Sequence, residues 1–148
     1  MKVRRSIAAA GAAVVLGTTG ALVLPAVASA HSASTTLKFI SVTKSSTMFG
    51  KTSGGQQDTD VNAAGKTVGF DMLYFKSVSA TTANVNVTVD TTGGFLYGTL
   101  TINFKTGVIS NGKVTGGTGS FAGATGTIMA KNRNPAGTRT AVTITYST

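Results

Sequence analysis

The sequence lacks several residue types that catalytic and metal-binding proteins use. Cysteine and glutamate are absent from its 148 residues, and His31 is the single histidine. A Ser-His-Asp or Cys-His catalytic site is therefore not predicted, and neither is a zinc site built from histidine and cysteine. Without cysteine there are no disulfide bonds, so the fold must be held by its hydrophobic core, with self-association as a second source of stability.

Charged residues make up only 11% of the chain, and most of them are basic. The 13 lysines and arginines outnumber four aspartates, which gives a net charge of +9. This sign suits anionic cell-wall polymers or lipid headgroups. The simpler interpretation is that the lysines are solvated surface residues, because they occur singly, without a patch or interleaved aromatics. Nucleic-acid binding is not predicted.

The first thirty residues have the pattern of a secretory signal peptide. Lys2, Arg4 and Arg5 precede an apolar stretch from Ile7 to Val23, and Ala28-Ser29-Ala30 is a small-residue cleavage motif. A retained membrane anchor is the alternative, but glycines and Pro25 interrupt the stretch, so we expect cleavage and no stable membrane insertion. The prediction is a secreted, extracellular protein with cell-wall association as an option. Its single domain is 31–148, with ten basic residues, four aspartates and a charge of +6.

The remaining residues alternate between apolar and polar with a period of two. Val85, Val87 and Val89 alternate with polar residues, and Val142, Ile144 and Tyr146 repeat the pattern. Turn-forming residues gather at 50–55, 77–82, 91–94, 106–107, 111–112 and 132–137. This spacing predicts about eight strands in a closed antiparallel barrel or a sandwich, both of which protect strand edges. Asn111-Gly112 fits either a tight turn or a bulge within a longer strand.

A glycine-rich run separates two expected strands, Val108 to Thr115 and Thr125 to Lys131. It predicts a reversal in which glycines permit positive φ or close backbone approach; these structural glycines are Gly116, Gly117, Gly119, Gly123 and Gly126. Gly117-Thr118-Gly119 is not a dinucleotide fingerprint, because Gly123 falls one place late and a strand follows.

Together with Gly65-Lys66-Thr67-Val68-Gly69, the run Gly116 to Gly126 resembles the "GKxVG" and "GGTGxFxGAxG" segments of the allene oxide cyclase and dirigent barrel families. The resemblance implies an all-β fold, an eight-stranded antiparallel β-barrel that is commonly oligomeric and has an apolar cavity, with no metal or cofactor. Allene oxide cyclases fold a fatty-acid epoxide for cyclisation, and dirigent proteins orient phenoxy radicals. This chain departs from the pattern at Thr125, where many members have arginine, and it lacks the cysteine often found near 73–75.

Two expected strands carry apolar residues on both faces. In the strand 68–76, one face carries Phe70, Met72 and Tyr74, while the other carries Asp71, Leu73 and Phe75. One face would fill the barrel and the other would meet a second copy, which predicts a dimer or trimer, or else a covering layer within the chain. In the strand 95–104, Leu96, Leu100, Ile102 and Phe104 form a core face, and Tyr97 is on the face that lines a cavity or meets a partner.

Asp71 is the candidate catalytic residue, because an aspartate that points into an apolar barrel loses its hydration and its pKa rises. Tyr74 or Tyr97 would handle protons with it, and Leu73, Phe75 and Tyr97 are the candidate ligand-binding residues. The alternative is a hydrogen-bonded structural aspartate. Asp58 and Asp60 are expected in a solvated loop, where a calcium site is only partly matched because the glycine and glutamate of an EF-hand are missing.

Three functions are consistent with these patterns. The first is an exported barrel that binds an apolar or aromatic small molecule and steers its cyclisation or coupling. The second is an isomerase or cyclase of the allene oxide cyclase type that uses Asp71. The third is a cell-surface structural or defence protein without catalysis, whose outer face mediates self-association. A hollow cavity with one carboxylate favours the second, and a filled interior favours the third.

Overall fold

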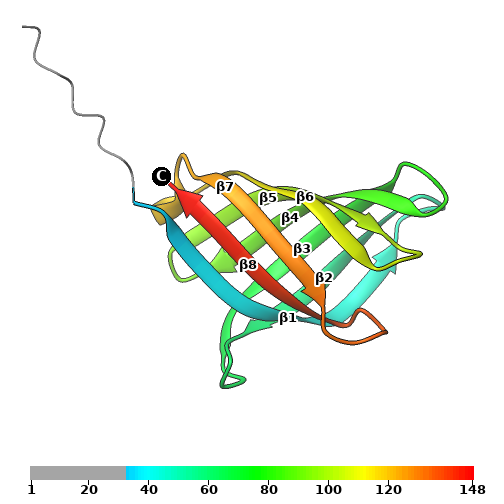
Figure 1. The fold of residues 1–148 in the computed structure, drawn as a ribbon, viewed down its shortest axis with the longest axis horizontal. Helices are drawn as coiled ribbons and strands as arrows, with labels where there is room; N and C mark the ends of the chain where they lie inside the picture. The colour runs from blue at the N-terminus through cyan, green and yellow to red at the C-terminus, as the bar shows by residue number, and fades with distance from the viewer. Residues whose placement is uncertain (1–32) are drawn as a thin grey trace, which may run out of the picture. The chain divides into compact units, whose positions relative to one another are not determined.

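The computed structural model describes residues 33–148, so the predicted signal peptide and His31 lie outside the described residues. Each strand pairs antiparallel with the next one along the chain, and the last pairs with the first, which closes the barrel (Figure 1). The strands are β1 (Thr35–Met48), β2 (Ser53–Val61), β3 (Thr67–Ser77), β4 (Thr82–Thr91), β5 (Gly94–Asn103), β6 (Val108–Gly117), β7 (Thr125–Asn132) and β8 (Arg139–Ser147). The predicted eight-stranded antiparallel β-barrel is confirmed.

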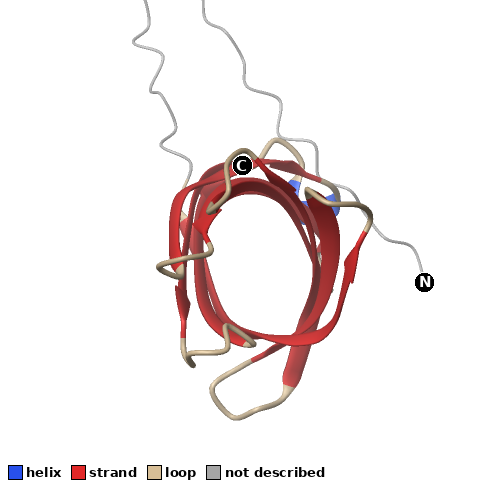
Figure 2. Ribbon diagram, turned by 90° about the vertical axis from the view of Figure 1, so that its right-hand side faces the viewer, coloured by secondary structure: helices blue, strands red, loops and turns tan. Residues whose placement is uncertain are grey.

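Alternation along the strands sorts side chains between the interior and the outside of the ring seen in Figure 2. In β4, Val85, Val87 and Val89 are buried, while Asn84 and Asn86 between them are exposed. Successive side chains of a strand point to opposite faces, so a period of two gives one apolar inner wall. Leu96, Leu100 and Ile144 extend the same core across β5 and β8.

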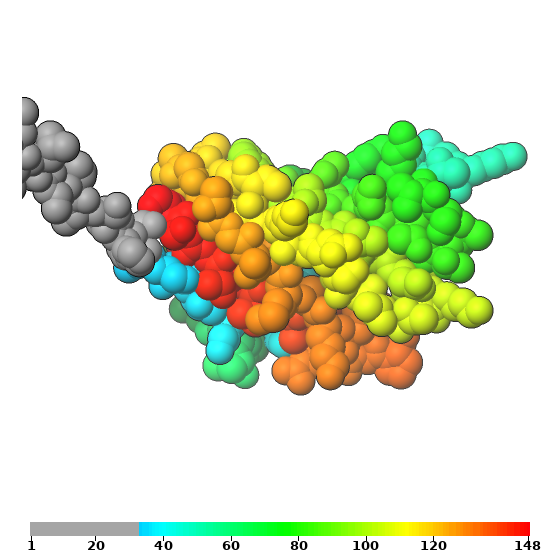
Figure 3. Space-filling model, turned by 45° about the horizontal axis from the view of Figure 1, so that its top comes forward, coloured from blue at the N-terminus to red at the C-terminus, as the bar shows by residue number. Residues whose placement is uncertain are grey.

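The two ends of the barrel are built differently. The β6–β7 connection contains a short 3₁₀ helix, η1 (Gly119–Phe121), and packs on the β4–β5 turn, where Ser120 N–H donates to the Gly93 carbonyl at 2.9 Å. Phe121 is buried in the core, edge-on to Tyr146 at 5.4 Å between ring centroids. The opposite end carries the β1–β2, β3–β4, β5–β6 and β7–β8 turns, and the β1–β2 turn projects in Figure 3.

Two positions in the glycine-rich run require the absence of a side chain. Gly119 has φ +60° and lies against the backbone of Gly93, where a Cβ atom would collide with the carbonyl oxygen. A Cβ atom at Gly117 would lie 2.6 Å from the Phe95 carbonyl oxygen. Gly116, Gly123 and Gly126 belong to the same stretch and also have positive φ. These glycines let the connection lie directly on the barrel end.

The Asn111-Gly112 pair is a bulge inside β6. Thr99 pairs with Lys113 and Thr101 with Ser110, so two residues of β6 lie opposite one residue of β5. Asn111 takes a positive φ of 54°. The pairing with β5 therefore shows that Asn111-Gly112 is a bulge and not a tight turn, a choice that the local sequence left open.

The prediction that Asp58 and Asp60 lie in a solvated loop was wrong. Both aspartates lie in β2, which begins at Ser53, so the expected turn at 50–55 ends earlier than its glycines indicated. Gly54 and Gly55 are strand residues that leave room for the rings of Phe75 and Phe49. Because several inward-facing residues of β2 are polar, its composition resembles that of a turn. Its pairing with both β1 and β3 nevertheless makes it a regular strand of the barrel wall.

Six large exposed side chains make up what we call the outer apolar face, in two rows on β3 and β5 that the polar outward residues of β4 separate: Val68, Phe70, Met72, Tyr74, Phe95 and Tyr97. The four on β3 occupy alternate positions, as predicted for a strand that is apolar on both faces. Phe104, expected in the core, is 52% exposed just after β5.

Among the described residues, no helix has the length and hydrophobicity needed to span a membrane.

Candidate functional site

The barrel contains a cavity of about 900 Å³. Most of its wall is apolar and comes from strands around the ring; the main contributors are Leu73, Phe75, Val87, Leu100, Ile128 and Val142. Its rim includes residues of the β5–β6 and β7–β8 turns, among them Lys105 and Pro135. Leu96, Val114, Phe121 and Ala124 are buried but do not line the cavity. They form a packed layer at the η1 end, so the cavity opens toward the other end.

Strand pairing brings three carboxyl groups together near this packed layer. Asp58 of β2 lies opposite Asp71 of β3, and residues opposite each other in a sheet share a face. Asp60 lies two residues further along β2, on the same inner face. All three side chains are buried, with Asp60 only 1% exposed. Asp58 and Asp71 line the cavity, and Asp60 lies behind them.

Asp58 is well supplied with hydrogen-bond donors. Ser41 Oγ donates to its Oδ2 at 2.7 Å, and Gln56 Nε2 lies 2.8 Å from Oδ2 and 3.0 Å from Oδ1. Gln56 is itself positioned by Thr43 Oγ1, 3.1 Å from the same nitrogen. The neighbouring carboxyls differ, because both oxygens of Asp60 and Oδ1 of Asp71 are buried without a hydrogen-bond partner.

The unpartnered carboxyls favour their protonated forms. Burial raises the pKa of Asp60 from 3.8 to about 9, and the negative charges of Asp71 and Asp58 add to this. Burial and the charge of Asp58 raise the pKa of Asp71 to about 6. At neutral pH, Asp60 is therefore protonated and adds no negative charge to the cluster.

The structure brings together three of the sequence-predicted site residues. Asp71, Leu73 and Phe75 all point inward and line the cavity. Tyr97 belongs to the outer apolar face and is 38% exposed, so it lies outside the cavity. Tyr74 is also outside, stacked on Phe49 at 6.3 Å between ring centroids. Tyr74 and Tyr97 lie on the opposite face of the sheet from Asp71. The prediction that one of them handles protons together with Asp71 was therefore wrong.

Sequence reasoning missed Asp58 and Asp60 as partners of Asp71. One available signal was their spacing, because residues i and i+2 share a face in any strand. A second was loop length: a connection from Gly50 to Asn62 would have been long for a hairpin, for which two to five residues are usual. Among residues 33–148, no group of three or more histidine, cysteine or acidic residues has a geometry that would hold a metal ion.

Comparisons with known proteins identify the barrel but not a family. No protein-family model matches the chain, and no curated protein matches it. A solved pyocyanin demethylase has a similar barrel. The two structures superpose with a TM-score of 0.55 over 76% of this chain and 100% of the other, at 15% sequence identity. This identity is low enough that the likeness shows the fold alone. It agrees with the barrel implied by the sequence motifs, while membership of the allene oxide cyclase and dirigent families stays a prediction.

Proposed function

We propose that this protein is a secreted barrel that binds an apolar or aromatic small molecule in its interior and steers cyclisation or coupling of that molecule. The observation that carries the proposal is the cavity of about 900 Å³, whose apolar middle section lies between a group of polar side chains at its deep end and a polar rim. Cavities of this size and composition are typical of small-molecule sites. A filled interior would have favoured a purely structural role.

Asp71 is the residue best suited to act on a bound molecule. It lines the cavity, and its raised pKa of about 6 lets it exchange a proton near neutral pH. A cyclisation is an isomerisation, so a proton that leaves at one step can return at another without a cofactor. The structurally similar pyocyanin demethylase acts, by its name, on pyocyanin. This supports a small-molecule function for the shared barrel.

Binding can be tested with a neutral fluorescent probe, N-phenyl-1-naphthylamine, on the chain without residues 1–30. We expect enhanced probe emission on binding, and we expect Leu73→Trp to weaken it because the larger ring projects into the cavity and takes space from the probe. Met72→Trp is the matched control, since Met72 is the adjacent residue and is 50% exposed on the outside. Circular dichroism would establish that both variants fold. Absence of binding to the wild-type protein would contradict the proposal.

The outer apolar face supports a second candidate, a cell-surface structural or defence protein without catalysis. Phe70, Met72 and Tyr74 follow one another on the outside of β3 and are 55%, 50% and 44% exposed, and monomeric proteins rarely expose large contiguous apolar patches. Self-association through this face would bury it. The Leu73→Trp variant separates the two candidates. A structural protein would keep its self-association in this variant, whereas a ligand-binding protein would lose ligand affinity.

A further inference from the structure

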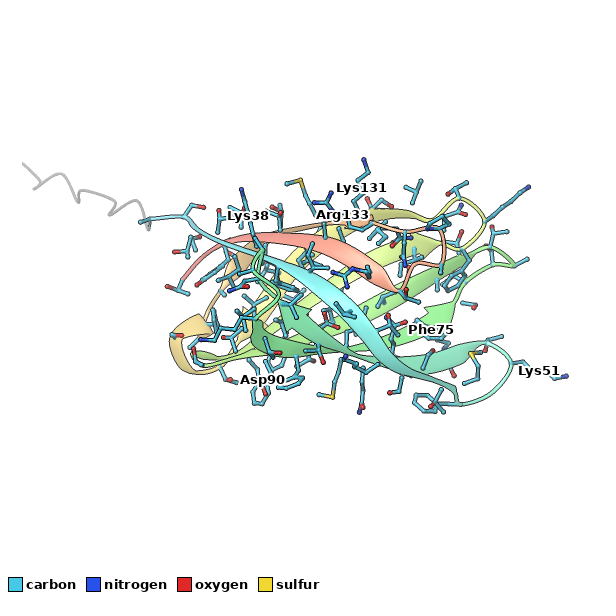
Figure 4. The ribbon with its side chains drawn as sticks, turned by 90° about the horizontal axis from the view of Figure 1, so that it is seen from below. Lys38, Lys51, Phe75, Asp90, Lys131 and Arg133 are labelled. Atoms are coloured by element: carbon cyan, nitrogen blue, oxygen red, sulfur yellow. The ribbon has the colours of Figure 1, made fainter. Side chains whose placement is uncertain are left out.

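The deep end of the cavity has an unbalanced negative charge. Three of the four aspartates of the chain meet there, on β2 and β3. The charged groups that act on Asp60 and Asp71 are the other carboxyls of the cluster, and no lysine or arginine is among them. Lys38 and Lys51 extend away from the barrel in Figure 4, and Lys105 and Lys131 lie at the rim of the cavity. The described residues therefore provide no cation for the cluster.

Hydrogen bonds within the cluster leave Asp71 short of donors. Ser41 and Gln56 serve Asp58, and β4 presents the apolar Val89 opposite Asp71. Asp71 Oδ1 has no side-chain or backbone donor, and its residue is only 4% exposed. A buried carboxylate without donors or a counter-ion is costly. Although Oδ1 itself is enclosed by protein, Asp71 also lines the cavity, so a positive charge placed there would offset the charge of this carboxylate.

The aromatic residues of the cavity wall add a second preference. Phe39 and Phe75 line the same cavity, and the faces of aromatic rings attract cations. An anionic ligand group at this depth would meet carboxylates, and a neutral group would leave their charge uncompensated. A cationic group would replace its lost hydration with ion pairs.

We infer that the ligand carries a cationic nitrogen, which binds at Asp58 and Asp71 while the apolar body of the ligand lies along Leu73, Val87 and Leu100. This inference rests on the proposed function and adds the chemical class of the molecule. Asp60 does not line the cavity, and its protonated form adds no charge to the site. A protonated amine and an N-alkylated heteroaromatic ring both belong to this class, because each joins a positive nitrogen to an apolar frame.

Three probes of similar shape test the charge preference: 1-naphthylmethylamine, which is a cation at neutral pH, neutral 1-naphthalenemethanol and anionic 1-naphthoate. Their dissociation constants would be measured by calorimetry at pH 7.5. We expect the cation to bind about tenfold more tightly than the alcohol, and the anion to bind most weakly. At pH 5 the preference for the cation should shrink, because Asp71, whose pKa is about 6, becomes protonated. This comparison uses the wild-type protein and does not depend on the folding of a variant.

A matched pair of variants assigns the preference to the cavity. Asp71→Asn should remove most of the advantage of the cation while the alcohol still binds. Asp90→Asn removes the same charge from the exposed, outer face of β4 and should leave all three affinities unchanged (Figure 4). Equal binding of cation and alcohol at pH 7.5, or an unchanged preference in Asp71→Asn, would overturn the inference and leave the proposed function standing. Failure of every probe to bind would overturn both.

Discussion

Replacing Asp60 with asparagine should make the barrel more stable at pH 8. In the folded protein the pKa of Asp60 is about 9, and its ordinary value is 3.8. A raised pKa means that the folded state holds a proton that the unfolded chain releases. The stability contributed by this proton is fully present below about pH 4 and is lost as the pH rises toward 9.

The magnitude follows from one proton released on unfolding. Each pH unit in this window changes the free energy of unfolding by about 1.4 kcal/mol for each such proton, so Asp60 alone should cost the wild-type protein about 4 kcal/mol between pH 5 and pH 8, and Asp71, whose pKa is about 6, should add about 1 kcal/mol. Asp60→Asn cannot ionise, so it stays neutral at both pH values. The variant should therefore exceed the wild type modestly at pH 5 and by about 4 kcal/mol more at pH 8.

Urea unfolding at pH 5 and pH 8, followed by far-ultraviolet circular dichroism, measures both free energies. Asp90→Asn is the control. Because Asp90 is exposed, this variant should show the same change in stability between pH 5 and pH 8 as the wild type. If the wild type is equally stable at the two pH values, or if Asp60→Asn loses stability in parallel with it, then Asp60 is not a buried, protonated carboxyl.

Three further outcomes are expected. Gly119→Val should lower the free energy of unfolding by about 1 to 3 kcal/mol, because its φ is +60° and the Gly93 carbonyl occupies the Cβ position, while Gly50→Val, in open space, should not. Equal urea midpoints for the two variants would contradict this. The secreted protein should begin at His31 by intact-mass measurement, and a dominant species that retains residues 1–30 would be evidence against cleavage. Light scattering at micromolar concentration should show a dimer or trimer, and a monomer would mean that the outer apolar face stays uncovered.

The sequence predicts those parts of the barrel where the inner wall is apolar. Val85, Val87 and Val89 share one face by alternation. Parity likewise places Asp71, Leu73 and Phe75 on one side of β3, and the structure shows that this side is the inside. The same rule separates the cavity side of β3 from the outer apolar face. These predictions need only local information, because a strand fixes which residues share a side.

The acid cluster was beyond local reasoning because its residues break the pattern that identifies a strand. Asp58 and Asp60 point inward, where alternation predicts apolar residues, so their segment resembled a turn. Their meeting with Asp71 depends on the register between β2 and β3. Tyr97 was placed on the correct face of its strand, but which face lines the cavity is decided by how the ring closes.

The unequal ends of the barrel separate what holds the fold from what admits a ligand. Phe121 and the β6–β7 connection fasten the η1 end, next to the acid cluster, through buried contacts and backbone hydrogen bonds. The turns at the open end surround the rim and contribute none of the most deeply buried side chains. Lengthening or replacing the β5–β6 or β7–β8 turn would therefore alter which molecules pass the rim while preserving the carboxyls below. The scaffold is suited to acquiring new ligands through loop exchange at a small cost in stability.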